Sequence, residues 1–362
     1  MLSKKICFIF VVLFCVQTLF ADKWFISRKD LESQGINYQT LFNAILSEKH
    51  QFVLAYSTLS KEDKAQGNVY ALHKLSLEKD GKITVQSVKL PVFFFGGIAL
   101  TDKGRTAVIV GNYGTKILRV STKSLKFQTV YEYKKGTPGF KTNVFTVGHR
   151  SRIFLDGYFY DEEQYSQGDF IVELLINRKE KTVDFEKKID LKKLYRKLNG
   201  HPKVLNLYSG DVAYLSIPNA AEKQTYLHYY NKGKTELIDK GLLIGSFAGA
   251  HHRLFYTILR DKKTRRSYVK DLKTKKVWEI GKPQVPYTYP FISKDGKVIM
   301  ICTVDIREQR MSVYVARESE DYKLHNLLDD VSVGPFKLSD SGAHYLYCHN
   351  KGISIQKTFK KK

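Results

Sequence analysis

Four carboxylate side chains gather in one short segment, Tyr158–Asp169, and form the best candidate metal site in the sequence. They are Asp161, Glu162, Glu163 and Asp169. A hard cation such as Ca²⁺ binds several oxygen ligands, which carboxylates supply. The segment lacks the alternating Asp positions and the closing Glu of a calcium-binding loop. We therefore expect a solvated acidic hairpin tip and no cofactor, with calcium binding as the alternative.

Cationic side chains are the second group that could do chemistry, because they could bind a polyanion. They concentrate in two segments, around residues 187–203 and 260–276. The candidate contacts are Lys187, Lys188, Lys192, Lys193, Arg196, Lys197 and Lys203 in the first segment, and Arg260, Lys262, Lys263, Arg265 and Arg266 in the second. The alternative is that these residues only solvate the surface.

The sequence contains none of the local motifs that mark the common catalytic sites. It has no phosphate-binding Gly-rich loop before a helix, no Gly-x-Ser-x-Gly turn, no His-Glu-x-x-His and no Cys-x-x-Cys. His251 and His252 are adjacent, so on a strand they would point to opposite faces and could not share one metal. A turn is the alternative, and a metal site is not favoured in either case. No catalytic residue is assigned, and a non-enzymatic function is favoured.

The charge balance indicates the kind of partner. The chain of 362 residues carries a formal net charge of +24. Without Lys4 and Lys5, 58 basic and 36 acidic residues remain, a net charge of +22. Such a surface attracts polyanions such as lipid phosphates, anionic glycans or extracellular nucleic acid, of which nucleic acid is the least favoured here. A lysine-rich genomic composition would give the same charge without any function.

The first 21 residues have the pattern of a signal peptide. Lys4 and Lys5 precede an apolar run, Ile6–Val16, and Ala21 offers a small residue for cleavage before Asp22. We therefore expect residues 1–21 to be removed and the protein to be secreted or periplasmic. The alternative is an uncleaved membrane anchor, although the run is short for a span of about 20 residues. No other segment is apolar enough to cross a bilayer.

The elements that must position these groups are β-hairpins. In Tyr289–Cys302, two apolar runs flank a polar turn from Ser293 to Gly296, where Gly can take a positive φ and Ser and Asp can bond the backbone. Similar stretches recur along the chain, each with a polar turn before an apolar run. Their turn residues are Ser47, Thr101, Thr146, Ser209, Ser246, Ser293 and Ser339.

The spacing of these turns predicts the architecture. Successive turn residues are 37 to 63 positions apart. Propeller blades of four strands repeat every ~40–50 residues, and longer intervals need inserted loops. The repeats therefore predict an all-β fold, a single seven-bladed β-propeller of four-stranded antiparallel blades over residues 22–362. An array of two-sheet sandwiches is the alternative.

One stretch also resembles a known family. The run from Pro290 to Ile301, with Val313-Tyr-Val following, is similar to the propeller repeats of TolB-like proteins, which are related to WD repeats. The resemblance covers about three blades, those at Thr101, Ser293 and Ser339. Most copies lack the proline, and no Trp-Asp dipeptide ends a blade. The resemblance implies a shared fold and not a shared activity.

Four further segments have local patterns of their own. Lys23–Ser27 should pair beside the C-terminal strand Gly352–Gln356 and close the ring. Asp190–Gly200 should be a short amphipathic helix inserted in the propeller. Lys29–Leu41 should be a short helix or a loop. The tail Lys357–Lys362 should be frayed.

Cys302 and Cys348 are expected to be buried thiols. Each stands nine residues after the turn residue of its repeat, Ser293 or Ser339. Equivalent positions in neighbouring blades lie roughly 10 Å apart. A disulfide needs Cα atoms within about 7 Å, so no disulfide is expected.

These features favour an exported, monomeric, non-enzymatic propeller that binds a protein or polyanionic partner through its loops and basic insertions. The alternative is a metal-dependent hydrolase or lyase of the lactonase type. Its site would lie in the central channel, where residues from several blades could meet.

Overall fold

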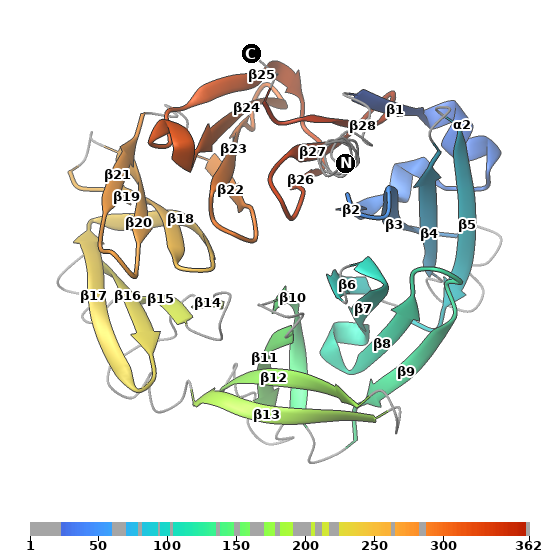
Figure 1. Ribbon diagram of the computed structural model, residues 1–362, viewed down its shortest axis with the longest axis horizontal. Helices are drawn as coiled ribbons and strands as arrows, with labels where there is room; N and C mark the ends of the chain where they lie inside the picture. Colours follow the sequence, from blue (N-terminus) through green and yellow to red (C-terminus); the bar gives the residue numbers. More distant parts are fainter. Residues whose placement is uncertain are drawn as a thin grey trace, which may run out of the picture.

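Seven four-stranded antiparallel sheets make up most of the chain that the structure describes. The computed structural model describes residues 23–59, 70–78, 82–92, 95–101, 104–134, 138–147, 153–159, 170–177, 182–190, 204–206, 212–216, 224–261, 265–281 and 287–359. The sheets stand radially around a common axis, and the strands towards the centre are β2, β6, β10, β14, β18, β22 and β26 (Figure 1). The β-propeller expected from the repeats is therefore confirmed.

The strands follow one another in chain order within six of the sheets. The first two sheets contain β2 (Phe42–Ser47), β3 (Phe52–Thr58), β4 (Tyr70–Leu77) and β5 (Ile83–Leu90), then β6 (Phe95–Thr101), β7 (Thr106–Gly111), β8 (Lys116–Ser121) and β9 (Phe127–Glu132). The next two contain β10 (Pro138–Val147), β11 (Ile153–Phe159), β12 (Phe170–Asn177) and β13 (Thr182–Asp190), then β14 (Val204–Asn206), β15 (Val212–Ser216), β16 (Thr225–Asn231) and β17 (Lys234–Gly241).

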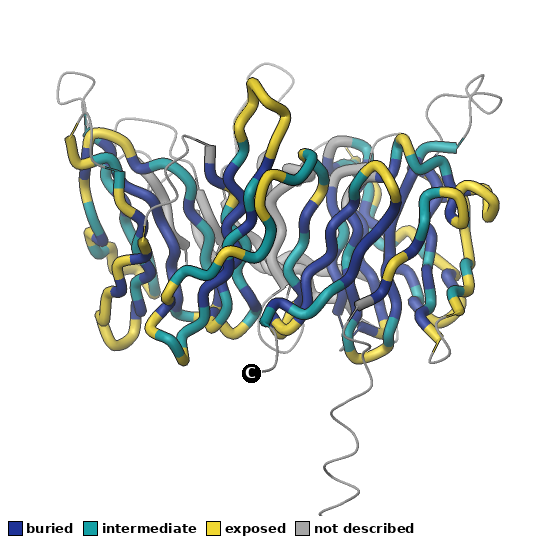
Figure 2. Tube along the Cα trace, turned by 90° about the horizontal axis from the view of Figure 1, so that it is seen from above, coloured by how far each residue is buried: buried dark blue, intermediate teal, exposed yellow. Residues whose placement is uncertain are grey.

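The last three sheets complete the ring. They contain β18 (Leu243–Ala250), β19 (Arg253–Leu259), β20 (Arg265–Asp271) and β21 (Val277–Ile280), then β22 (Tyr287–Ile292), β23 (Val298–Asp305), β24 (Arg310–Arg317) and β25 (His325–Ser332), and finally β26 (Phe336–Leu338), β27 (His344–His349), β28 (Gly352–Lys357) and β1 (Lys23–Ser27). Buried residues lie along the middle of the strands, whereas exposed residues gather in the turns at the two faces of the ring (Figure 2).

The N-terminal strand closes the ring as the sequence predicted. β1 pairs antiparallel with β28, with Trp24 opposite Ile355 and Ile26 opposite Ile353. β28 runs one residue further than expected, to Lys357. Trp24 and Ile26 are buried in one apolar cluster with side chains of the first sheet, including Val53. The last sheet is thus built from both ends of the chain.

Short helices connect β1 to the first sheet. The segment Lys29–Leu41, expected as a short helix or a loop, contains α2 (Arg28–Ser33) and the 3₁₀ helix η2 (Tyr38–Thr40). Ser27 caps α2, because its Oγ accepts the N–H of Asp30 at 3.0 Å. Two further 3₁₀ helices are η5 (Asn112–Gly114) and η7 (Glu318–Glu320). Residues 191–200 of the helix expected at Asp190–Gly200 lie outside the described residues.

Every repeat found in the sequence falls on the first two strands of a sheet. Ser293 and Ser339 directly follow a strand, whereas Ser47 and Thr101 are the last residues of β2 and β6. Two of the turn assignments are wrong, because Thr146 lies inside β10 and Ser246 lies inside β18. Ser209 lies outside the described residues. In β18 the pairing with β19 shifts between Ile244 and Phe247. Such a bulge adds residues to the strand, so β18 continues to Ala250 before it turns.

The Ser and Gly of the repeat have separate tasks in the turn. Ser293 Oγ accepts the N–H of Val298 at 2.9 Å and donates to Asp295 Oδ1 at 2.7 Å. Ser339 Oγ accepts the N–H of His344 at 3.1 Å in the same way. The side chain therefore satisfies the first backbone donor of the second strand.

The Gly residues allow neighbouring sheets to approach closely. Gly104, Gly296 and Gly342 have φ of +91°, +75° and +75°, a backbone region that strains other residues. A Cβ at these positions would lie 2.7 Å from Ser47 Oγ, 2.6 Å from Arg253 Cγ and 2.5 Å from Val298 Cβ, respectively. Each contacted atom belongs to the preceding sheet. The repeat Gly thus sets the turn and the spacing between sheets together.

Both expected thiols are buried and free. Cys302 packs in a cluster with Phe336 and Tyr345 of the next sheet, and Cys348 packs in a cluster with Leu46 of the first sheet. Burial raises the pKa of each thiol to about 12. The two cysteines therefore occupy equivalent places at successive interfaces, as their spacing predicted.

The C-terminal tail is not frayed over its described part, which corrects the expectation for Lys357–Lys362. Thr358 is 2% exposed, and its N–H donates to Ala343 O at 2.8 Å. The ring of Phe359 lies 4.6 Å from Arg317 Cζ. The tail is ordered because it packs across two sheets, while residues 360–362 lie outside the described residues.

We expect Gly342→Ala to destabilise the fold by about 2–4 kcal/mol, because Ala is strained at this φ and its Cβ would overlap Val298. Gly281→Ala is the matched control, since nothing lies within 4 Å of a Cβ there. Urea unfolding of both variants measures the difference. Equal stability of the two variants would contradict the role given to the repeat Gly.

A buried histidine in β4 should make the fold sensitive to acid. His73 is 1% exposed, with Nε2 2.9 Å from Ser57 Oγ and Nδ1 2.7 Å from Ser87 Oγ. Burial lowers the pKa of His73 to about 4, whereas an unfolded histidine titrates near 6.5. Between these values the unfolded chain binds the extra proton, so stability falls as the pH falls.

The expected loss between pH 7 and pH 4 is at most about 3 kcal/mol from this one group. His73→Gln removes the titrating group, so its stability deficit relative to the unmodified protein should shrink as the pH is lowered. Thermal unfolding of both proteins across this range measures the deficit. A deficit that stays constant with pH would show that His73 does not titrate as proposed.

Candidate functional site

A pocket of about 460 Å³ opens where the sheet β2–β5 meets the sheet β6–β9. It is lined by His50, Phe52, Lys74, Arg105, Ser121, Thr122 and Lys123. Three of these side chains are cations, and two others carry hydroxyl groups. Its volume is in the usual range for a site that binds a small molecule. The site therefore combines a ligand-sized space with positive charge.

The first sheet supplies an aromatic floor beneath one of the cations. Phe52 begins β3 and is 2% exposed, in a cluster shared by both sheets. Lys74, on the adjacent β4, places its Nζ 5.3 Å from the centroid of the Phe52 ring. The ring of His50 is stacked on Phe52 at 6.3 Å between centroids. These contacts hold the Lys74 ammonium in place, since a cation is attracted to the face of an aromatic ring.

The second sheet supplies a wall made from two turns that are joined by hydrogen bonds. Thr122 Oγ1 donates to Gly104 O at 2.7 Å, and Thr122 N donates to Arg105 O at 3.1 Å. Thr122 is 4% exposed, so this connection is buried. It fixes the backbone of Arg105, Ser121 and Lys123 at the edge of the pocket.

The cations of the pocket lack carboxylate partners within the described part of the chain. Lys74, Arg105 and Lys123 form no ion pair with a described Asp or Glu. Burial lowers the pKa of Lys74, and the charge of Glu78 partly opposes that effect. Three positive charges therefore share one space without a described counter-ion in contact.

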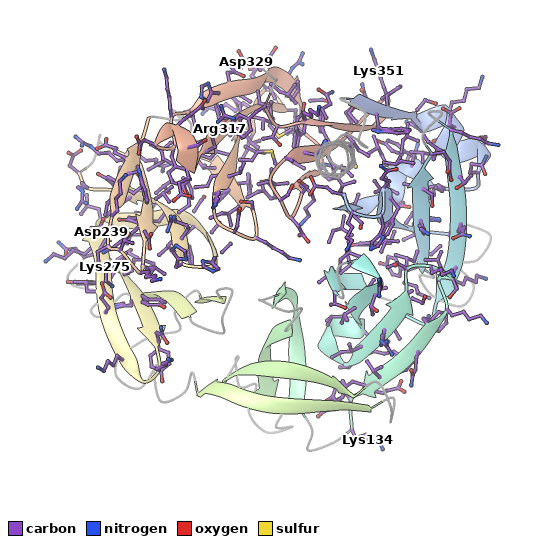
Figure 3. All side chains as sticks on the ribbon, viewed as in Figure 1. Lys134, Asp239, Lys275, Arg317, Asp329 and Lys351 are labelled. Atoms are coloured by element: carbon purple, nitrogen blue, oxygen red, sulfur yellow. The ribbon has the colours of Figure 1, made fainter. Side chains whose placement is uncertain are left out.

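Several cations elsewhere on the described surface are paired with carboxylates. Charged side chains of both signs surround the ring, as the labelled Lys134, Asp239 and Asp329 illustrate (Figure 3). Ion pairs join Lys275 to Glu236, Lys276 to Asp321 at 3.3 Å and Lys294 to Asp340 at 2.6 Å. In the pocket, no described carboxylate forms an ion pair with Lys74, Arg105 or Lys123, and the charge of Glu78 acts on Lys74 without such a contact.

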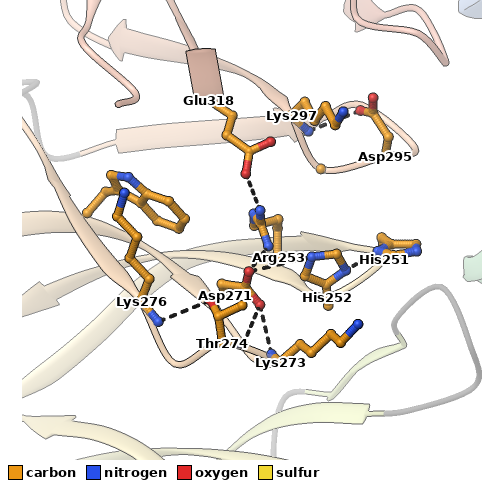
Figure 4. A network of polar contacts seen from close by, with 12 residues as sticks. His251, His252, Arg253, Asp271, Lys273, Thr274, Lys276, Asp295, Lys297 and Glu318 are labelled. Carbon is orange, nitrogen blue, oxygen red and sulfur yellow. Dashed lines mark hydrogen bonds and ion pairs between the residues drawn. The ribbon is translucent and has the colours of Figure 1, made fainter. Parts of the chain in front are cut away.

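A second polar cluster, centred on Arg253, links two neighbouring sheets by ion pairs (Figure 4). Arg253 is 7% exposed, and its guanidinium pairs with Asp271 of its own sheet and with Glu318 of the next sheet. Asp271 Oδ1 also accepts the N–H groups of Lys273 at 2.8 Å and Thr274 at 3.0 Å. Burial alone would raise the pKa of Asp271, but these hydrogen bonds and the charge of Arg253 lower it. Because the charges satisfy one another, the cluster is structural.

The two adjacent histidines lie in a turn and not on a strand, which is the second of the two arrangements open from the sequence. β18 ends at Ala250, and His251 has φ of +54°. Their rings are 4.2 Å apart between centroids in an edge-to-face arrangement, and the two Nδ1 atoms face each other. His252 Nε2 lies 3.5 Å from Asp271 Oδ2. No group of three or more His, Cys, Asp or Glu that could hold a metal occurs among the described residues.

Most site residues expected from the sequence lie outside the described residues. This holds for the acidic residues Asp161, Glu162, Glu163 and Asp169, and for the basic residues Lys192, Lys193, Arg196, Lys197, Lys203, Lys262 and Lys263. The strands β11 and β12 that flank the acidic segment pair antiparallel, as a hairpin requires. Lys187 and Lys188 belong to β13, the outer strand of its sheet, but their side chains are not described.

The described members of the second basic group lie at a surface edge. Arg260 pairs with Asp239 at 3.0 Å, and Arg266 pairs with Glu279 at 3.2 Å. Arg265 begins β20. Exposed pairs of this kind contribute little to stability and neutralise part of the positive charge.

Sequence reasoning missed the residues of the pocket. Lys74, Arg105 and Lys123 come from three separate segments, and none lies within either of the two basic segments selected from the sequence. One local signal was present, because Lys74 is a charged residue in the strand Tyr70–Leu77, most of whose other residues are buried. To predict that Lys74 lies near Arg105, one would also need to know which turns of neighbouring sheets contact each other.

No family model matches the chain, and no curated protein matches it. Among solved structures, the chain is similar to an acylaminoacyl peptidase from Pyrococcus horikoshii, with a TM-score of 0.58 and 12% identity over 87% of this chain and 50% of that one. It is also similar to the β-propeller domain of the Trilobed protease from Pyrococcus furiosus, described as having an open velcro topology, with a TM-score of 0.58 and 11% identity over 89% and 94%.

A third similar structure is the β-propeller domain of Cps50 (Swd1) from Myceliophteria thermophila, with a TM-score of 0.50 and 9% identity over 88% of this chain and 97% of that one. The chain spans about half the length of the acylaminoacyl peptidase it matches. At these identities the likeness shows the propeller fold alone.

We expect Arg253→Met to destabilise the protein by about 3–5 kcal/mol, because it leaves Asp271 buried without its cation. Arg266→Met, which breaks the exposed pair with Glu279, should cost less than about 1 kcal/mol. Chemical unfolding of the two variants compares these costs. If Arg253→Met costs no more than Arg266→Met, the cluster is not the link described above.

Proposed function

We propose that this chain is an exported, non-enzymatic β-propeller that binds an anionic glycan or surface through the pocket formed by Lys74, Arg105 and Lys123. The single observation that carries the proposal is the convergence of these three cations, without described counter-ions, in a space of about 460 Å³. A concave site lined by one sign of charge concentrates ligands of the opposite sign. The net charge of +22 that remains without Lys4 and Lys5 favours the same class of partner.

Export belongs to the proposal because of the signal-peptide pattern in residues 1–21. These residues lie outside the described part of the structure. Within that part, none of the helices has the length and apolar character needed to span a bilayer. The remaining basic residues at 187–203 and 260–276 would extend the attraction around the ring without forming the specific contact.

The alternative of a metal-dependent hydrolase or lyase is not favoured by a specific observation on the described residues. Some structural neighbours are peptidases, but the similarity to them concerns the fold alone. It covers only half of the acylaminoacyl peptidase chain. The binding proposal rests instead on residues that can be changed individually.

Binding to a heparin column and to anionic lipid vesicles should weaken steeply with salt, because exposed charges are screened within a Debye length. The variant Lys74→Gln, Arg105→Gln, Lys123→Gln should elute from the column at much lower salt, with affinity reduced about tenfold or more. The matched control is Arg266→Gln, Lys275→Gln, Lys276→Gln, which removes the same charge from ion-paired positions. The control should retain most of the binding.

Two results would overturn the proposal. Retention that does not depend on salt would show that charge is not the source of binding. Equal losses in the pocket variant and the matched control would show that only the net charge matters. Comparing the column with the vesicles separates a glycan partner from a membrane surface.

A further inference from the structure

We infer that the pocket between the first two sheets binds one phosphate monoester carried on a sugar-sized group. The inference rests on the proposed function and adds the class of ligand that the pocket recognises. The main observation is that Lys74, Arg105 and Lys123 line a space that is larger than a phosphate group. Whether the monoester is free or attached to a larger glycan or lipid leaves this chemistry unchanged.

The number of charges favours a dianion over a carboxylate. Lys74, Arg105 and Lys123 carry three positive charges, no described carboxylate forms an ion pair with them, and the charge of Glu78 acts on Lys74 from a longer distance. A carboxylate would neutralise one of these charges and leave two like charges close together. A phosphate monoester carries a charge of about −1.5 to −2 near neutral pH, so it compensates most of the excess.

The types of donor match the oxygen atoms of a phosphate group. The Arg105 guanidinium offers a planar fork that can bond two oxygens at once, and the two ammonium groups act as flexible point charges. The Ser121 hydroxyl can donate a further hydrogen bond. The Thr122 hydroxyl already donates to Gly104 O at 2.7 Å, so it holds the wall together.

The first sheet prepares one cation before any ligand arrives. Lys74 lies over Phe52 with its Nζ 5.3 Å from the ring centroid, and Phe52 itself is 2% exposed. Lys74 is partly buried, so its ammonium has lost part of its hydration, and this burial lowers its pKa. An oxyanion would replace that hydration and gain more from Lys74 than from a fully solvated lysine.

The size of the pocket indicates that the ligand is more than inorganic phosphate. A volume of about 460 Å³ leaves room beside the anion for the group that carries it. His50 is an exposed member of the lining, and its ring is stacked on the buried Phe52. The ring of His50 can therefore lie against a sugar, with Phe52 supporting it from below.

The test is calorimetric titration of the full mature protein with four probes: glucose 6-phosphate, glucose 6-sulfate, glucuronate and inorganic phosphate. Glucose 6-phosphate and glucose 6-sulfate differ only in the ester anion and its charge, whereas glucuronate carries a carboxylate at C6 of the same sugar. We expect glucose 6-phosphate to bind with a stoichiometry of one and at least about tenfold more tightly than glucuronate. Inorganic phosphate should bind more weakly than glucose 6-phosphate.

Variants locate the binding. Lys74→Met keeps the apolar stem over Phe52 but removes the charge, and Arg105→Gln removes the fork. Each substitution should lower the affinity for glucose 6-phosphate about tenfold or more. Lys275→Gln, which removes an exposed cation paired with Glu236, should leave the affinity unchanged within about twofold. Thermal unfolding of each variant confirms that it is folded.

The inference is overturned if glucose 6-phosphate does not bind, if it binds no better than glucuronate, or if the pocket variants bind it as tightly as the unmodified protein. It is also overturned if inorganic phosphate binds as tightly as glucose 6-phosphate. These results leave the proposed function standing when heparin retention still depends on salt and on Lys74, Arg105 and Lys123. Loss of that dependence overturns the proposed function separately.

Discussion

The pairing of β1 with β28 is the contact on which the rest of this structure depends. It joins Trp24 and Ile26 to the last sheet, so that this sheet has four strands and two apolar faces. One of those faces packs against the first sheet in the cluster that contains Val53 and Cys348. Sheets in a ring bury both faces only when the ring is closed, and a missing strand would expose the edge of β28. Every interface further round the ring therefore relies on this one.

Within the closed ring, the turns determine both the spacing of the sheets and the shape of the pocket. A repeat Gly lies against the preceding sheet at Gly104, Gly296 and Gly342. The contact of Gly104 with Ser47 and His50 brings the turn before β7 close to the turn after β2. As a result, Arg105 reaches the same space as Lys74. The pocket thus forms because a repeat Gly brings two turns of adjacent sheets together. The side chains of these turns, which vary from turn to turn, determine its charge.

The sequence was sufficient for the fold because the fold depends on repeated local chemistry. Polar turns followed by apolar runs located the first two strands of each sheet, and Cys302 and Cys348 were correctly placed as equivalent buried thiols. A bulge in β18 misplaced the turn assigned to Ser246, because a bulge leaves no mark in the hydrophobic pattern. The pocket could not be predicted, since Lys74, Arg105 and Lys123 are brought together only by the packing of two sheets.

Net charge alone is a poor guide to where such a protein binds. The described surface contains many lysines and arginines whose charge is already neutralised, including Lys275 by Glu236 and Arg266 by Glu279. A ligand that approached them would have to compete with a carboxylate held by the protein. The cations of the pocket are few, and no described carboxylate is in ion-pair contact with them, although the charge of Glu78 acts on Lys74. Since binding energy comes from the charge that remains uncompensated, the arrangement of partners, and not the count of basic residues, directs an anion to this pocket.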